Sequence, residues 1–255
     1  MDNLETVRAQ FTKQAVPFSN APAMRDSAAI ALLIDAAGAA PLQRTLDVAC
    51  GPGLVVHAFA RVVSHASGID ATPAMIARAS ELGREQGLAN IELRVGEATA
   101  LPYEDGTFDA VTCRFAFHHI PELSTVMKEM VRVCRVGGKV VVCDACASDD
   151  PIKAAAFNRM ERLRDPSTVR FLALSELASL FEQMGLGAPE RRFYQTPLDL
   201  DSLMKGSFPA ETDAPRVRQL IEASLQNDEL GLGTKLHDGR ISLAYPTVIL
   251  SAQRP

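Results

Sequence analysis

The sequence contains no tryptophan, few aromatic residues and no long hydrophobic run. Aromatic side chains make up 5% of the 255 residues, so a platform on which the bases of single-stranded nucleic acid could stack is not expected. The longest strongly apolar stretch, residues 28–40, is too short to cross a bilayer and is interrupted by Asp35 and Gly38. We therefore expect no membrane span.

Clustered positive charge is also missing. The formal net charge is −5, and 26 Lys and Arg residues are interleaved with 31 Asp and Glu residues, whereas duplex phosphates are bound by basic patches. No apolar stretch follows the first ten residues, so no signal peptide is expected. Five cysteines in mostly apolar surroundings favour reduced thiols over a disulfide framework. These features predict a cytoplasmic protein with no nucleic-acid partner.

Strand and helix patterns alternate along most of the chain, which predicts parallel strands joined by helices. The expected strands are 44–49, 67–70, 91–95, 108–115, 139–144 and 191–196, with the second arm of a terminal hairpin at 241–251 after an Asp238-Gly239 turn. The expected helices are 4–15, 23–39, 54–63, 73–86, 122–135, 151–164, 175–184 and 214–226, with a breaker-rich link at 17–22. The predicted fold is α/β: a doubly wound, Rossmann-like sheet of seven strands with an antiparallel last strand and a helical cap.

The most informative segment is the glycine turn after the first strand, Asp47-Val-Ala-Cys-Gly51-Pro-Gly53. Such a turn lets the backbone approach a ligand closely, although a tight turn without a ligand is the simpler alternative. The dinucleotide fingerprint G-x-G-x-x-G fails here, because Leu54 or Val56 stands where a small residue is required. A nicotinamide-dependent oxidoreductase is therefore disfavoured.

Acidic residues end or follow successive predicted strands. Asp70 ends the second strand and Glu97 follows the third; a carboxylate in the first place can accept hydrogen bonds from both ribose hydroxyls, and one in the second from an adenine amino group. Because the carboxyl ends of parallel strands meet at one edge of the sheet, Asp47, Asp70 and Glu97 should converge on one crevice. Each acid alone is more simply a solvated loop residue, but the three together predict a nucleoside site.

Residues 44–146 resemble the class I S-adenosylmethionine-dependent methyltransferases, in the subgroup typified by the ubiquinone and menaquinone biosynthesis enzymes. The resemblance rests on the glycine turn and on Gly68-Ile-Asp70, Met75, Gly96-Glu97-Ala98, the segment 101–109, Phe117-His118-His119-Ile120 and Gly137-Gly138. It implies transfer of a methyl group from S-adenosylmethionine to a carbon, oxygen or nitrogen atom of a small-molecule acceptor.

The resemblance also implies roles for residues of the crevice that contains Asp47. Gly51, Gly53 and the backbone around Arg114 would border the methionine part of the cofactor. Asp70 would hold the ribose hydroxyls. At the adenine, Met75 would pack against the ring, Ala98 would bound it, and Glu97 would accept a hydrogen bond from the amino group. This sequence departs from the usual family pattern at Ala49, Glu97 and Val136.

The acceptor side is less specified. A phenol, enol or acidic carbon must lose a proton, and histidine titrates in the useful range, so His118 and His119 are candidate bases; a role in shaping the pocket is the alternative. Arg159 and Arg162 are three residues apart on one helix face and could grip an acidic acceptor, although a solvated face is the simpler interpretation.

We expect all 255 residues to form a single methyltransferase domain. Its expected parts are an N-terminal helical lid (1–40), a cofactor-binding core (41–150), substrate-cap insertions with one core strand (151–230) and a terminal hairpin (231–255). No metal is expected, because Cys143 and Cys146 would face opposite sides of a strand. A non-catalytic S-adenosylmethionine-binding module remains the main alternative. The acceptor and the oligomeric state are not predicted.

Overall fold

The computed structural model describes residues 2–255, and within them the strands form one eight-stranded sheet in the order β3-β2-β1-β4-β5-β8-β6, with β7 paired to β8. The strands are β1 (Arg44–Val48), β2 (His65–Asp70), β3 (Ile91–Val95), β4 (Phe108–Arg114), β5 (Cys134–Ala145), β6 (Glu190–Asp199), β7 (Lys235–His237) and β8 (Arg240–Gln253). The helices are α1 (Asn3–Asn20), α2 (Ser27–Ala36), α3 (Leu54–Phe59), α4 (Pro73–Glu85), η1 (Phe117–His119), α5 (Leu123–Val133), α6 (Pro151–Arg164), α7 (Leu174–Gln183), α8 (Leu200–Ser207) and α9 (Ala214–Asn227).

The sheet has the predicted α/β character. β1, β2, β3, β4 and β5 pair in parallel, while β8 is antiparallel to both β5 and β6. The eighth strand, absent from the predicted seven, is β7, the short first arm of the terminal hairpin. Its turn is at Asp238 and Gly239, which both have positive φ, as a two-residue hairpin turn requires.

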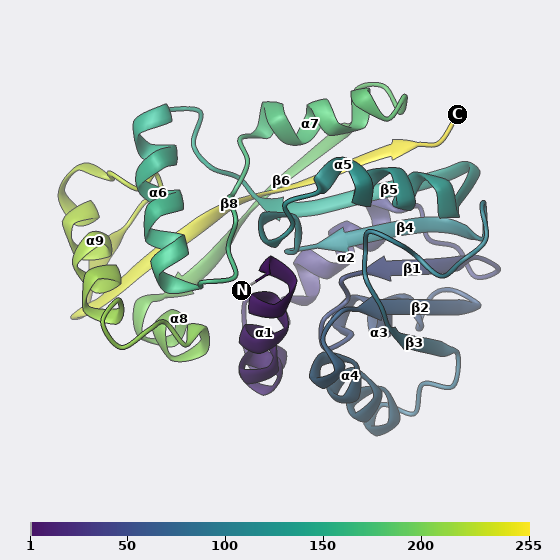
Figure 1. The fold of residues 1–255 in the computed structure, drawn as a ribbon, viewed down its shortest axis with the longest axis horizontal. Helices are drawn as coiled ribbons and strands as arrows, with labels where there is room; N and C mark the ends of the chain where they lie inside the picture. Colours follow the sequence, from purple (N-terminus) through teal and green to yellow (C-terminus); the bar gives the residue numbers. More distant parts are fainter. Residues whose placement is uncertain (1) are drawn as a thin grey trace.

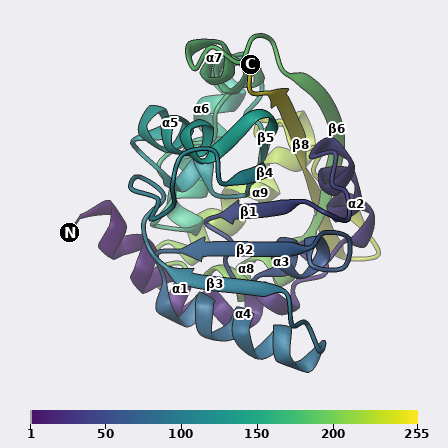
Figure 2. The same cartoon turned by 90° about the vertical axis from the view of Figure 1, so that its right-hand side faces the viewer.

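Apolar side chains of alternating strand positions pack on both faces of the sheet. In β5, Val140 and Val142 belong to the core against α5 and α7, while Val141 and Cys143 belong to the core against α2 and α3. Figure 2 shows α5 on one side of the strands and α2 with α3 on the other. This double coverage explains why β5 is a continuous apolar run.

Helices α6, α8 and α9 form a third apolar cluster around the extended ends of β6 and β8. Figure 1 shows them beyond the parallel part of the sheet, with α1 between α8 and α4. α1 packs against both of those helices. The N-terminal helix therefore connects the parallel sheet to the helical extension.

Several predicted boundaries were wrong, and one helix was missed; α3, for example, ends at Phe59 and not at 63. α1 does not end before Pro17 but continues to Asn20, because its packing on α4 and α8 compensates for the amide that proline lacks. α2 begins at Ser27 rather than at 23, because the Asp26 carboxylate accepts the amides of Ala28 and Ala29 and caps the helix there. α8 was not predicted at all.

Candidate active site

The glycine turn is joined directly to the end of β2. Gly51 has a φ of +53°, and its amide donates to Oδ2 of Asp70 at 2.8 Å, while the amide of Thr72 donates to Oδ1 at 2.8 Å. Burial raises the pKa of Asp70, and these two backbone hydrogen bonds oppose the rise. The carboxylate is thereby held in one orientation at the carboxyl edge of the sheet.

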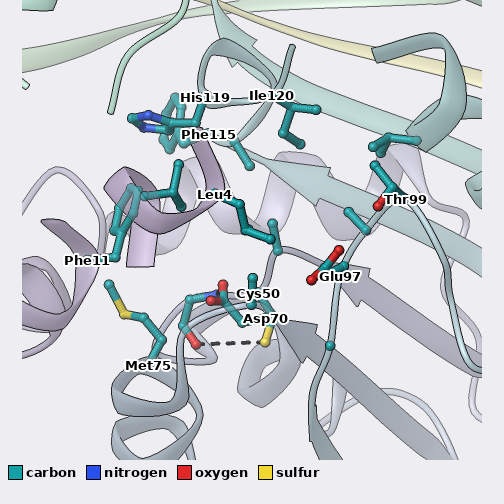
Figure 3. A pocket seen from close by; sticks show the side chains of 18 of the residues that line it. Leu4, Phe11, Cys50, Asp70, Met75, Glu97, Thr99, Phe115, His119 and Ile120 are labelled. Atoms are coloured by element: carbon teal, nitrogen blue, oxygen red, sulfur yellow. Dashed lines mark hydrogen bonds between the residues drawn. The ribbon is translucent and has the colours of Figure 1, made fainter. Parts of the chain in front are cut away.

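A cavity of about 430 Å³ lies at this edge. It is lined by Asp47, Gly51, Asp70, Met75, Glu97, Ala98 and Arg114, so the three acids expected to converge do share one crevice. Figure 3 shows Leu4 and Phe11 of α1 between Asp70 and Met75 on one side and His119 and Ile120 on the other. We call it the first cavity.

Gly53 is not among the residues that line the first cavity. It has a φ of +79°, and a Cβ added to it would lie 2.9 Å from both Cβ of Ala79 and Nε2 of His57. Glycine is therefore required at this position for the close packing of α3 on α4, and this packing holds the glycine turn in place.

Asp47 is a buried acid with one short hydrogen bond. Thr112 Oγ1 donates to its Oδ1 at 2.6 Å from the neighbouring strand β4. Burial raises the pKa of Asp47 to about 7, against the lowering effects of the Thr112 hydrogen bond and of the Arg114 charge. Its carboxyl can therefore change charge near neutral pH.

Arg114 ends β4 on the same face of the strand as Thr112, and its side chain is buried. Its Nη1 donates to the carbonyl of Met24 at 3.1 Å, while Nε and Nη2 have no partner within residues 2–255. The sequence resemblance drew attention only to the backbone at this position. The structure adds a buried positive charge beside Asp47.

Glu97 is exposed at the rim of the first cavity. Its Oε1 pairs with Nη2 of Arg8 at 3.1 Å, and Nε of Arg8 donates to the carbonyl of Ala71 at 3.0 Å. Arg8 was not expected near the site, because nothing in its local sequence connects α1 to β3. It fastens α1 over the cavity.

A second cavity of about 450 Å³ lies between α1, α6, α8 and the ends of β5, β6 and β8. Its lining includes His118, Phe171 and Tyr245 together with Arg164 and Asp165. Phe11, Phe18, Phe115 and His119 line both cavities. These four residues, here called the shared wall, therefore separate two adjoining chambers.

His118 is held by a buried carboxylate. Its Nδ1 lies 2.8 Å from Oδ1 of Asp144, its backbone amide donates to Oδ2 at 3.1 Å, and its ring stacks on Phe171 with centroids 4.0 Å apart. Asp144 was not predicted as a site residue, although it lies near the end of β5, next to β4, where its carboxylate reaches the same edge.

His119 is enclosed instead. Its Nδ1 is 3.0 Å from Oγ of Ser167, its ring packs edge-on against Phe11 with centroids 4.9 Å apart, and its carbonyl accepts the side-chain amide of Asn3 at 2.8 Å. Burial and the neighbouring His118 lower the pKa of His119 to about 3. Its imidazole is neutral at physiological pH.

Arg159 and Arg162 are exposed on α6, and neither is among the residues lining the two cavities. The helix turns their shared face toward solvent and turns Arg164 toward the second cavity. Arg164 is already engaged: it pairs with Glu161 at 2.7 Å and donates to Oγ of Ser207 at 2.7 Å. The structure therefore does not bring the two predicted arginines to the site.

Within residues 2–255 no cluster of three or more His, Cys, Asp or Glu side chains has the geometry to hold a metal ion. In the same part of the chain, no helix is both long enough and apolar enough to cross a membrane.

The family described as methyltransferase domain matches residues 46–142. A Bacillus subtilis (strain 168) protein named uncharacterized methyltransferase YcgJ is 32% identical over 220 residues, which span 86% of this chain and 87% of that protein. The chain belongs to the class I S-adenosylmethionine-dependent methyltransferases. The crystal structure of YcgJ has a TM-score of 0.82 to this methyltransferase and 28% identity, and covers 89% of this chain and 99% of its own.

A demethylmenaquinone methyltransferase from Bacillus cytotoxicus (strain DSM 22905 / CIP 110041 / 391-98 / NVH 391-98) is 31% identical over 168 residues, which span 57% of this methyltransferase and 70% of that protein. The family match ends at residue 142, within β5. It therefore covers the strands that form the first cavity, whereas Asp144 and the residues of α1, α6 and α8 that line the second cavity lie outside it.

Proposed function

We propose that this methyltransferase binds S-adenosylmethionine in the first cavity and transfers its methyl group to a small molecule in the second. The observation that supports this most is the shared wall, because two adjoining chambers allow donor and acceptor to meet. Both volumes lie within the range of about 300–1,000 Å³ found for small-molecule sites.

The first cavity has hydrogen-bonding capacity that suits the nucleoside. Each oxygen of Asp70 accepts one backbone amide, and a carboxylate has about four acceptor positions, so two remain for the ribose hydroxyls. Glu97 uses Oε1 for Arg8, which leaves Oε2 for the adenine amino group. Met75 and Ala98 supply apolar surface for the ring.

The methionine end belongs in this proposal beside Gly51, Asp47 and the backbone around Arg114. A positive φ at Gly51 and open space above it let the backbone approach the ligand, since the nearest atom to an added Cβ is Met75 Sδ at 4.0 Å. The Asp47 carboxylate is placed to accept from the methionine ammonium group. Gly53 acts indirectly, by allowing the packing behind the turn.

When bound, S-adenosylmethionine supplies a methyl carbon made electrophilic by its sulfonium. The protein's part is to align the acceptor with that carbon and to exclude water. The phenyl rings of the shared wall provide a dry lining. His119 belongs to the shared wall and His118 lines the second cavity; these are the two histidines near the acceptor, where a base could remove its proton.

The test of the donor site is calorimetric titration with S-adenosylhomocysteine, the demethylated product. We expect Asp70→Ala to weaken binding by at least about tenfold, because a hydrogen bond to a charged group contributes about 1.5–3 kcal/mol. Asp201→Ala is the matched control, since Asp201 is an exposed acid that pairs with Arg218 and is not among the residues lining either cavity. Equal affinity of the wild type and Asp70→Ala would contradict the assignment.

The test of transfer is incubation with S-adenosylmethionine and a panel of phenols, enols and amines, followed by mass spectrometry for the gain of one methyl group. Product from any of them, lost on addition of excess S-adenosylhomocysteine, supports the proposal. Tight binding of S-adenosylhomocysteine with no methylated product would favour a non-catalytic binding module.

We also propose a cytoplasmic location and no nucleic-acid partner. Five cysteines are free and four of them are buried, and burial raises the pKa of each buried thiol. Such thiols suit a reducing compartment. The net charge of −5 opposes binding to a polyanion.

A further inference from the structure

His118 differs from His119 in what its second ring nitrogen meets. Nδ1 of His118 lies 2.8 and 3.0 Å from the two oxygens of Asp144, so the carboxylate holds the proton on Nδ1. Nε2 has no hydrogen-bond partner within residues 2–255. It is not one of the buried polar atoms that lack a partner, so it is accessible from the cavity. Since the ring lines the second cavity, Nε2 of the neutral Nδ1–H tautomer can accept a proton from a molecule there.

Asp144 is built to fix that ring. Its side chain is 3% exposed, and besides Nδ1 it accepts the backbone amides of His118 at 3.1 Å and Ala145 at 2.8 Å. Phe171 stacks on the imidazole with an interplanar angle of 14°. The Asp144 carboxylate, itself fixed by two backbone amides, and the stacked phenyl ring thus restrict the imidazole to one orientation and one tautomer.

The rest of the second cavity suits a flat acceptor. Arg164 in its wall pairs with Glu161 at 2.7 Å, Asp165 accepts the side-chain amide of Gln14 at 2.9 Å, and one oxygen of Asp199 accepts the amide of Ser202 at 2.9 Å. Five aromatic side chains give the chamber a flat apolar lining: Phe11, Phe18, Phe115, Phe171 and Tyr245.

We propose that His118 is the catalytic base, that Asp144 is its positioning residue, and that the acceptor is a flat, weakly acidic hydroxyl compound such as a phenol or enol. This inference rests on the proposed methyl transfer. The acceptor's O–H bond breaks and its proton goes to Nε2; the electron pair left on the acceptor forms the bond to the methyl carbon. The carbon–sulfur bond breaks, its electron pair stays on sulfur, and Asp144 balances the imidazolium until its proton returns to water.

His119 does not fill this role. Its Nδ1 contacts Ser167 and its ring is packed against Phe11. The pKa of about 3 makes it too weak a base to take a proton from a phenol. It serves as part of the shared wall.

The first experiment needs no acceptor. Nitrogen-15 NMR of the histidine-labelled protein at pH 8 is expected to show His118 with a protonated Nδ1 and an unprotonated Nε2. Asp144→Asn should remove this preference, whereas Asp150→Asn, the same change at the exposed cap of α6, should leave it intact. A wild-type His118 protonated on Nε2 would overturn the proposal.

The second experiment compares two acceptors, phenol and 4-nitrophenol, at pH 8, where only the nitro compound is already ionised. General-base catalysis contributes about 10²–10⁴-fold, so His118→Gln and Asp144→Asn should slow methylation of phenol by that factor and of 4-nitrophenol by less than tenfold. Equal losses on both phenols, or methylation of amines with neither phenol accepted, would overturn it. Absence of S-adenosylhomocysteine binding by wild type would instead reject the proposed function.

Discussion

Asp47 shows how one buried residue can set a pH dependence. It lies within the field of Arg114, which lowers its pKa, and of Asp70, which raises it, while burial dominates and brings its pKa to about 7. Cys50 and Cys113 also lie close enough for Asp47 to affect their thiols. A folded-state pKa above the ordinary 3.8 means that the folded protein holds this proton more tightly than the unfolded chain. Its contribution to stability is therefore full below pH 3.8 and is lost as pH rises toward 7.

The affinity for S-adenosylhomocysteine should increase with pH, whereas the contribution of Asp47 to stability decreases. In the proposed donor site the ligand's ammonium group pairs with the charged Asp47 carboxylate, so affinity should rise between pH 6 and 7.5, by at most about tenfold per pH unit, and level off above. Calorimetry across this range measures the slope, and Asp47→Asn should flatten it. A slope that survives in the variant would show that another group is responsible.

At the scale of elements, the turn between β1 and α3 depends on how closely α3 and α4 approach. Gly53→Ala must place a Cβ 2.9 Å from both Ala79 and His57 while keeping a φ of +79°. We expect a loss of about 2–5 kcal/mol in the free energy of unfolding, the sum of the costs of a left-handed backbone and of an overpacked contact. Denaturant titration measures it.

Gly187→Ala is the matched control for this loss. Gly187 has a φ of +72°, and nothing lies within 4 Å of an added Cβ. It should therefore show only the backbone cost, about 1–2 kcal/mol. Similar losses in the two variants would show that the helix contact adds nothing.

Helix and strand boundaries also show which features could be predicted from sequence. The parallel strands were predicted because each combines an apolar run with nearby turn residues, and the glycine turn, Asp70 and Glu97 follow strands whose ends must meet. α1 continuing through Pro17 was not predictable, because tertiary packing overrides the local signal. Asp144 and Arg8 were missed because their partners are 26 and 89 residues away in the sequence.

At the scale of the whole molecule, ligand binding and stability are linked. S-adenosylhomocysteine at one hundred times its dissociation constant should stabilise the folded state by about 2.7 kcal/mol. For a chain of this length that corresponds to a rise of about 5–10 °C in the melting temperature, measurable by calorimetric scanning. Asp70→Ala at the same ligand concentration should show a smaller rise, and an equal rise would mean that the ligand binds elsewhere.

The shared wall has a kinetic and thermodynamic consequence. Because Phe11, Phe18, Phe115 and His119 touch both chambers, any shift of these side chains on filling one chamber changes the shape of the other. Binding of the donor would then change the affinity for the acceptor by some factor. Thermodynamic linkage requires that binding of the acceptor change the affinity for the donor by the same factor. In the proposed two-chamber arrangement, with α1 fastened by Arg8 across the rim, the two ligands should therefore bind cooperatively rather than independently.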